Sequence, residues 1–376
     1  MGKRELVLIV LFLAAGVIVY QVTAPPAPAG SDVSVGGIFQ HLKRGVQGAR
    51  ETANGESHQT VPVEPAVRML RINLPRASDL TITGSDRTDI AIEVKSTAHG
   101  YTAQEAKAAA DGTTLKVEAA GDGLSISGMW AMSHGGSGDA FVTQVTITLL
   151  VPRRLAVSVQ PHIGLLNVTD VAKVEAVSSR GETHVLRTAG DVQLTHIGGA
   201  LEVIGASSLT LTARNSKGEV SKIAGATRLD ATGGRLSLGE LAGTLDVEAR
   251  NADLVFEKAG GLKPAFRVNA IGGSLRIDGL RTEGRIDGRN TDIDVKLDAA
   301  APVTIYNLGA IVVTAPPNGY TLDASTTEGR VTVEDSGITP SEGPDSHAAG
   351  KVRGGGPTLT LRATRGRIDV RKKSVQ

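Results

Sequence analysis

The chain has 376 residues, with 40 basic and 39 acidic side chains interspersed and a net charge of +1. No basic patch stands out, which argues against a nucleic acid partner, and the lack of cysteine excludes a disulfide scaffold, a thiolate metal site and a lipoprotein anchor. Forty-six glycines and only 3% aromatic residues favour repeated tight corners and a thin aliphatic core over a compact globule.

The N-terminus has the pattern of an export segment. Lys3 and Arg4 precede an uncharged stretch from Leu6 to Tyr20, which is short for a bilayer span of about 20 residues and within range of a signal peptide. We predict one hydrophobic helix in residues 1–24 and favour a transmembrane anchor over a signal cleaved near Ala27-Pro28-Ala29. Because basic residues stay on the cytoplasmic side, either reading exports the rest of the chain.

Two segments separate this helix from the repeats. Residues 25–60 begin with a proline-rich run, and we expect a flexible linker. Residues 61–152 contain short alternating segments that predict strands, and Thr102–Ala110, with Glu105 in its first turn, predicts the one helix of this region. We interpret residues 61–152 as a small β-rich cap that seals the open end of the repeat region.

Residues 153–370 repeat a phrase in which a glycine is followed by two aliphatic residues at alternate positions. One copy reads Gly199-Ala200-Leu201-Glu202-Val203, and copies recur mostly every 16 to 21 residues. Such a period indicates a solenoid, and the alternation is that of a strand with one buried face. A second strand column lies half a period away, with too few residues between strands for a crossover helix. The predicted fold class is therefore all-β, a right-handed parallel β-helix or β-solenoid.

The alternation also assigns side chains to faces. The aliphatic pairs expected to point inward are Leu201/Val203, Leu236/Leu238, Leu254/Phe256, Leu275/Ile277 and Ile293/Val295. The residues expected to point outward are Glu202, Arg235, Ser237, Asp253, Arg276, Asp292 and Asp294. Corners that need positive φ are predicted at Arg180-Gly181, Arg214-Asn215, Arg250-Asn251, Arg289-Asn290 and Arg365-Gly366.

The end of the repeat region is less regular. Thr339–Pro357 is rich in glycine, proline and serine, and we interpret it as a loop inserted into a rung that still closes through Leu359-Thr360-Leu361. Residues 371–376 form a polar tail.

The closing segment Leu359-Thr360-Leu361 with Arg365-Gly366-Arg367-Ile368-Asp369-Val370, the glycine–aliphatic ladder and the exported N-terminus together resemble a bacterial family. These are the putative adhesin domain proteins of unknown function, which carry a β-solenoid. Val151–Val157 also resembles the segment by which such proteins enter the coil. The resemblance covers roughly residues 65–370 and implies the fold. It brings no functional residue with it.

Enzymatic chemistry finds little support in the residues. β-Helical glycan-cleaving enzymes need two acids in a groove, or a base with a calcium-bound carboxylate. The outward acids are instead interleaved with arginines, as a solvated face requires. Asp292 and Asp294 beside Asp287 suggest at most weak calcium binding, and His184 and His196 are interpreted as surface residues. We predict no catalytic residue, no metal site and no cofactor.

The candidate contact residues are Met129, Trp130 and Met132, which precede a glycine-rich loop. Exposed apolar tips can bind partners, and the alternative is that Trp130 folds back into the core. The predicted function is a non-enzymatic, membrane-anchored envelope protein, an adhesin or interaction scaffold whose partner is an envelope or cell-surface protein or glycan. An exported carbohydrate-active β-helix enzyme and a solenoid that self-assembles through its ends remain alternatives.

Overall fold

The computed structural model describes residues 12–13, 15–16, 51–74, 78–130, 140–334 and 337–373. The predicted N-terminal helix (1–24) and residues 25–50 of the linker fall outside this part of the chain, apart from the four helical residues at 12–13 and 15–16. Within the described residues, no helix is long and apolar enough to cross a membrane. The N-terminal anchor therefore stays a prediction.

The chain divides into two units. The smaller comprises Met1–Glu56, Lys95–Thr114 and Trp130–Gln144, and the larger comprises Ser57–Val94, Leu115–Met129 and Val145–Gln376. The smaller unit contains the predicted helix, α3 (Ala103–Asp111). The Thr102 hydroxyl accepts the Glu105 backbone N–H at 3.2 Å, and the Glu105 carboxylate accepts the Thr102 N–H at 3.3 Å. This capping box explains why the helix begins where the sequence predicts.

The linker prediction was wrong at its C-terminal end. Residues 51–60 belong to a strand, β1 (Glu51–Pro62). Gly55 is its only buried residue, and most of its other positions are exposed. Because this strand has no apolar face, it lacks the alternation by which the other strands are detected.

The remaining strands follow in chain order. Those before the regular repeats are β2 (Met69–Asn73), β3 (Asp79–Ser85), β4 (Asp89–Gly100), β5 (Thr114–Ala120), β6 (Gly123–Met129), β7 (Phe141–Pro152), β8 (Ala156–Ile163) and β9 (Leu166–Thr169). The long strands of the repeats are β10 (Lys173–Leu186), β11 (Asp191–Ala206), β12 (Ser208–Ile223), β13 (Thr227–Gly239), β14 (Leu245–Glu257) and β15 (Phe266–Leu280). The last are β16 (Gly284–Arg289), β17 (Asp292–Leu297), β18 (Val303–Asn307), β19 (Ile311–Thr314), β20 (Tyr320–Thr326), β21 (Val331–Val333), β22 (His347–Val352), β23 (Thr358–Ala363) and β24 (Ile368–Arg371).

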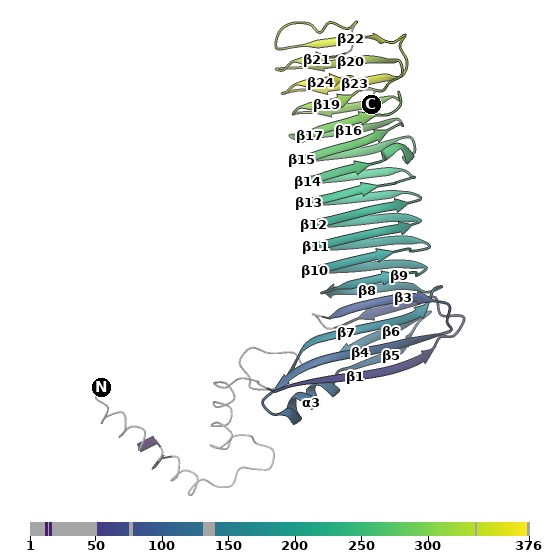
Figure 1. Cartoon of the computed structure of the whole chain (residues 1–376), viewed down its shortest axis with the longest axis vertical. Helices are drawn as coiled ribbons and strands as arrows, with labels where there is room; N and C mark the ends of the chain where they lie inside the picture. The colour runs from purple at the N-terminus through teal and green to yellow at the C-terminus, as the bar shows by residue number, and fades with distance from the viewer. Residues whose placement is uncertain are drawn as a thin grey trace. The chain divides into compact units, whose positions relative to one another are not determined.

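The larger unit is a β-solenoid in which each rung has two strand segments that meet at a corner (Figure 1). In β10 to β15 one long strand runs through the corner, and neighbouring strands pair in parallel and in register. Val174 lies opposite Val192, for example, and Val185 opposite Val203. From β16 onward the corner breaks each rung into two shorter strands. The all-β solenoid is therefore confirmed, while its right-handed sense stays a prediction.

The predicted inward and outward faces are confirmed. All ten residues of the five aliphatic pairs are at most 3% exposed. The seven outward residues between them are exposed or half-buried. Burying one branched or aromatic side chain contributes roughly 1.5–3 kcal/mol, so the stacked aliphatic columns supply the stability of the unit.

The predicted corners are confirmed as well. The backbone has positive φ at Arg180, Asn215, Asn251, Asn290 and Gly366. Successive rungs approach closely there, since a Cβ placed on Gly199 would lie 2.0 Å from the Gly181 carbonyl oxygen. Glycine is therefore needed for space as well as for its conformational freedom.

At the N-terminal end, residues expected to form a separate cap contribute rungs to the solenoid. β2 pairs in parallel with β6 on one side and β8 on the other. β3 likewise pairs with β7 and with β9. The rung of β2 and β3 thus lies between the rung of β6 and β7 and that of β8 and β9. The long connection through β4, α3 and β5 hides the repeat period in the sequence.

At the C-terminal end, too, the order of the strands in the solenoid differs from their order in the chain. β23 pairs with β18 and β20, and β24 pairs with β19 and β21, so the last two strands slot between rungs that precede them in the chain. β22 then pairs antiparallel with β20. The inserted loop predicted at 339–357 is therefore partly wrong, because it contains this edge strand. Ile338 is 8% exposed, and its side chain lies against Gly350.

Leu236→Asp tests the assigned core. The substitution leaves an unpaired carboxylate in the inward column, where Leu236 is 2% exposed, and we expect a loss of roughly 3–5 kcal/mol. Urea unfolding followed by circular dichroism measures this loss. The control, Ser237→Asp, is one residue away on the outward face and should change stability by at most about 0.5 kcal/mol. Similar losses in both variants would contradict the assigned faces.

Gly234→Ala tests the corner. Gly234 has φ +85°, and a Cβ there would lie 2.0 Å from the Ser216 carbonyl oxygen. We expect a loss of at least about 1–3 kcal/mol, measured as a lower thermal midpoint. Gly239 on the same strand is the matched control, because its Cβ would meet only Ser221 Cβ at 3.9 Å. A neutral Gly234→Ala variant would show that the rungs can separate at the corner.

Candidate binding surface

The three predicted contact residues differ in their exposure to solvent. Met129, the last residue of β6, is 75% exposed. Trp130 is half-buried, and Met132 lies outside the described residues. Met129 therefore has the exposure that a contact residue needs, and the binding role of all three stays a prediction.

Several of the outward acids are held by neighbours. The Glu202 carboxylate lies 2.9 Å from His184 Nδ1 on the adjacent rung, and the Asp253 carboxylate accepts Arg235 at 3.5 Å and Ser274 at 2.7 Å. Asp287 on β16 is bound by Arg285 at 2.6 Å. Asp292 and Asp294 lie on β17, beyond the corner from Asp287. The three aspartates expected to favour weak calcium binding are thus divided between two strands.

Ion pairs also connect the turns that follow the second strand segment of each rung. The Arg187 guanidinium donates two hydrogen bonds to the Asp170 carboxylate, at 3.0 and 2.7 Å, and holds the pKa of Asp170 below its usual value. Lys258 donates to Glu240 at 2.6 Å and lowers the pKa of Glu240 in the same way. Carboxyl groups with lowered pKa values stay ionised at neutral pH, so they are unsuited to act as general acids.

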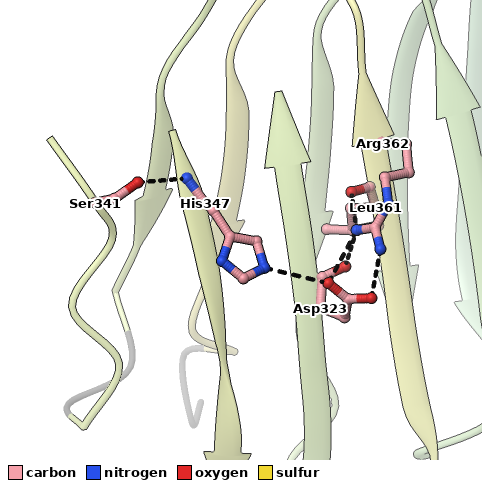
Figure 2. A network of polar contacts seen from close by, with 5 residues as sticks. All are labelled: Asp323, Ser341, His347, Leu361 and Arg362. Atoms are coloured by element: carbon pink, nitrogen blue, oxygen red, sulfur yellow. Dashed lines mark hydrogen bonds and ion pairs between the residues drawn. The ribbon is translucent and has the colours of Figure 1, made fainter. Parts of the chain in front are cut away.

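A third network joins the C-terminal strands (Figure 2). The Arg362 guanidinium on β23 donates to both oxygens of the Asp323 carboxylate on β20, and His347 Nε2 on β22 lies 3.4 Å from Asp323 Oδ1. Ser341 Oγ accepts the His347 backbone N–H at 2.8 Å. Arg362, and then His347, lower the pKa of Asp323. The network holds β22 and its preceding loop to the terminal rungs.

A polar cluster inside the solenoid was missed by the sequence analysis. Thr183 Oγ1 donates to Ser178 Oγ at 2.8 Å, and Ser178 Oγ lies 2.9 Å from His196 Nδ1. Ser178 is 1% exposed and His196 is 0% exposed, so the interpretation of His196 as a surface residue was wrong. The signal was present, because the alternation of Val192 and Leu194 continues inward to His196.

The Ser178–His196 contact resembles a nucleophile and its base, but its burial determines what it can do. The core column continues from His196 into Ala213, Ala231 and Ala249 on the next rungs. Backbone and side chains of the stack therefore enclose the pair, and no substrate can reach the serine oxygen. Burial lowers the pKa of His196, so the imidazole is kept neutral as a hydrogen-bonding core residue.

Shallow grooves lie along the outer surface of the solenoid. One of about 850 Å³ is lined by ten residues that include Asp278, Lys296, Asp298 and Lys373. Its charges are matched, because Lys296 pairs with Asp278 at 3.5 Å and Lys373 with Asp298 at 2.6 Å. This groove offers polar contact area with little net charge.

Another groove, of about 590 Å³, lies beside the corner. It is lined by Lys217, Gly218, Gly234, Arg235, Ser237, Asn251 and Asp253. Asp253 is its only acid, and Arg235 and Ser274 already bind that carboxylate. Lys217 is exposed and has no ion pair within the described part of the chain. The amino group of Lys217 is therefore the charged group of this groove that is open to a ligand.

No protein-family model matches the chain, and no curated protein sequence matches it. Solved structures matched in a structure comparison include a putative cell adhesion protein from Clostridium sporogenes, which is 14% identical, with 85% of this chain and 100% of that chain covered and a TM-score of 0.18. A putative adhesin from Parabacteroides distasonis is 11% identical, with 85% and 97% covered and a TM-score of 0.34. A putative lipid binding protein from the same species is 12% identical, with 69% and 97% covered and a TM-score of 0.33.

The descriptions of these solved structures as putative adhesins agree with the family that the sequence resembles. With identities below 15% and TM-scores below 0.5, these structures add no argument about what the chain binds. The functional argument therefore rests on the residues of this chain.

His196→Ala tests the buried cluster through pH. The unfolded histidine titrates near pH 6.5, whereas burial lowers the pKa of His196 in the fold. The unfolded state therefore binds more protons between these two pKa values, and wild-type stability should fall as the pH drops below about 6.5. The variant, which carries the alanine of the next rungs, should show a shallower fall.

The measurement is the urea midpoint from pH 8 to pH 5. Val192→Ala is the control, because it truncates a buried side chain of the same strand without removing a titratable group, and it should keep the wild-type pH dependence. An unchanged pH dependence in His196→Ala would contradict a buried neutral imidazole.

Proposed function

We propose that this chain is a non-enzymatic cell-envelope protein that acts as an adhesin or interaction scaffold through the outer surface of its β-solenoid. The observation that carries the proposal is the distribution of its polar groups. The Ser178–His196 contact is sealed in the core, while acids such as Glu202, Asp253 and Asp287 are held by partners on the surface.

The architecture suits extended contact with a partner. Parallel rungs about 4.8 Å apart present the same outward positions at regular intervals, and each rung is fixed by the rungs beside it. Such a surface binds through many shallow polar contacts. A glycan or protein of the envelope or cell surface is the kind of partner that can engage several rungs at once.

The proposed location is outside the cytoplasm, with the N-terminal segment as a membrane anchor. The support is the uncharged stretch from Leu6 to Tyr20 behind Lys3 and Arg4, since basic residues are retained on the cytoplasmic side. The absence of cysteine suits an oxidising compartment, where free thiols react.

A binding experiment tests the proposal. Fluorescently labelled full-length chain in mild detergent is applied to an array of bacterial envelope glycans and to fixed bacterial cells. We expect saturable binding, with bound glycans unchanged in length after incubation, because surface acids such as Asp253 and Asp287 are held by arginines rather than free for acid–base chemistry. Heat-unfolded chain is the control for non-specific adsorption.

Two outcomes would contradict the proposal. Shortened glycans would indicate a carbohydrate-active enzyme. Wild-type chain that is folded by circular dichroism but binds neither cells nor glycans would remove the adhesin role.

A further inference from the structure

One row of residues runs along the corner of the solenoid, just before the bend of each rung. The register places Ile197 opposite Arg214, Arg214 opposite Thr232, Thr232 opposite Arg250, Arg250 opposite Ile271 and Ile271 opposite Arg289. We call these six residues the corner ridge. They lie on β11 to β16, which stack as consecutive rungs in Figure 1. Arginine thus occupies every second rung.

The residues at the bend alternate in the same way. Each ridge arginine is followed by an asparagine, while Ile197, Thr232 and Ile271 are each followed by two glycines. The side-chain oxygen of Asn215 lies 2.5 Å from where a Cβ of Gly233 would be, and that of Asn251 lies 2.4 Å from the Cβ position of Gly272. Gly233 and Gly272 also have positive φ, so an asparagine corner is followed by a glycine corner on the next rung, and the pattern repeats every two rungs.

The ridge arginines form no ion pair in the part of the chain that the structure describes, unlike several other basic residues of the solenoid, although Glu248 and Asp287 stand two residues before Arg250 and Arg289 on the same strands. Arg187 pairs with Asp170, and Lys258 pairs with Glu240. Arg214, Arg250 and Arg289 are all exposed, and none forms an ion pair within the described ranges. Three guanidinium groups in a line, each open to solvent, form a surface that favours a polyanion.

The groove of about 590 Å³ beside the corner extends this surface. Asn251 of the corner is one of its lining residues, together with Lys217. The exposed amino group of Lys217 adds a positive charge next to the ridge. A ligand lying along the ridge can thus also fill this groove.

The spacing of the ridge narrows the class of ligand. Rungs are about 4.8 Å apart, so arginines on alternate rungs recur about every 10 Å. One sugar ring advances an extended glycan by nearly the same length as one rung. A linear glycan with an acidic group on every second sugar therefore matches the arginines in charge and in period. The exposed aliphatic side chains of Ile197 and Ile271, 40% and 47% exposed, meet the C–H faces of the intervening sugars.

Other polyanions match less well. The phosphates of a nucleic acid strand recur at closer intervals, and the ridge has no aromatic side chains on which bases stack. A membrane surface needs a broad apolar and basic face, whereas the ridge is one side chain wide.

We propose that the corner ridge binds a linear anionic glycan that carries its charge on alternate sugars, with Arg214, Arg250 and Arg289 as the binding residues. The inference rests on the proposed function and specifies its ligand class. Guanidinium groups hold carboxylates, sulfates and phosphates through paired hydrogen bonds. Because arginine alternates with smaller side chains along the ridge, the ridge favours a glycan whose charged groups recur at the same spacing as the arginines.

The test measures binding of the full-length chain to three purified polysaccharides at moderate salt. Hyaluronan carries a carboxylate on every second sugar, alginate carries one on every sugar, and dextran is neutral. We expect wild-type chain to bind hyaluronan more tightly than alginate and not to bind dextran. The R214Q/R250Q/R289Q variant should bind hyaluronan about tenfold or more weakly, because three charge contacts are lost.

The matched control removes three exposed charges away from the corner. Lys173, Lys263 and Arg267 are exposed and form no ion pair in the described part of the chain. The K173Q/K263Q/R267Q variant should bind within about twofold of wild type, since screening at moderate salt weakens distant charges. Circular dichroism and the thermal midpoint establish that both variants are folded. An equal loss in the two variants would overturn the ridge as the site.

The remaining outcomes separate this inference from the proposed function. Wild-type chain that binds cells but not hyaluronan overturns the ridge inference and leaves the adhesin role intact. A ridge variant that binds hyaluronan as tightly as wild type does the same. If the wild-type chain binds hyaluronan but no cells, and the ridge variant binds hyaluronan more weakly, the result supports the corner ridge as a glycan site. The same result counts against the proposed adhesin role.

Discussion

The close approach of successive rungs at the corner is the constraint on which the rest of the solenoid depends. Parallel, in-register strands lie about 4.8 Å apart, and the bend brings a carbonyl oxygen of one rung within 2.0 Å of the place where a Cβ would stand on the next, as at Gly199 and Gly234. Only glycine, or a residue with a suitable neighbour, fits there. The fixed corner keeps the two strand columns in register, and this register stacks Leu236 on Leu254 and places Arg235 opposite Asp253.

The C-terminal end of the solenoid is protected against pairing with another chain. A terminal rung presents unpaired backbone groups that can join another chain. At the C-terminus, β23 and β24 are paired on both sides, β22 covers the edge of β20, and Ile338 is buried against Gly350. The Asp323–Arg362–His347 contacts fasten this arrangement. Addition of another chain at this end would require β22 and its preceding loop to detach. The structure therefore favours the adhesin or scaffold function over self-assembly through the ends.

The sequence predicts those features that depend on neighbouring residues in a rung. Alternation identified the inward column from Leu201 to Val295, and the arginine–asparagine pairs identified corners with positive φ. What depends on contacts distant in sequence was missed: the exposed strand β1, the rung of β2 and β3 held between later strands, and β22 inside an apparent loop. His196 was missed for another reason, because a polar side chain was interpreted as a surface residue although it continues the alternation of Val192 and Leu194.

The candidate binding surface follows from the same packing rule. The side chains of Asn215 and Asn251 pack against Gly233 and Gly272 of the following rungs, and this asymmetry makes neighbouring corners chemically different. The residues before the bend can then alternate too, with arginine on one rung and isoleucine or threonine on the next. A one-rung repeat would place arginines about 5 Å apart, where their mutual repulsion opposes an unpaired row. The two-rung repeat doubles this distance, so a line of unpaired positive charge becomes compatible with a stable solenoid.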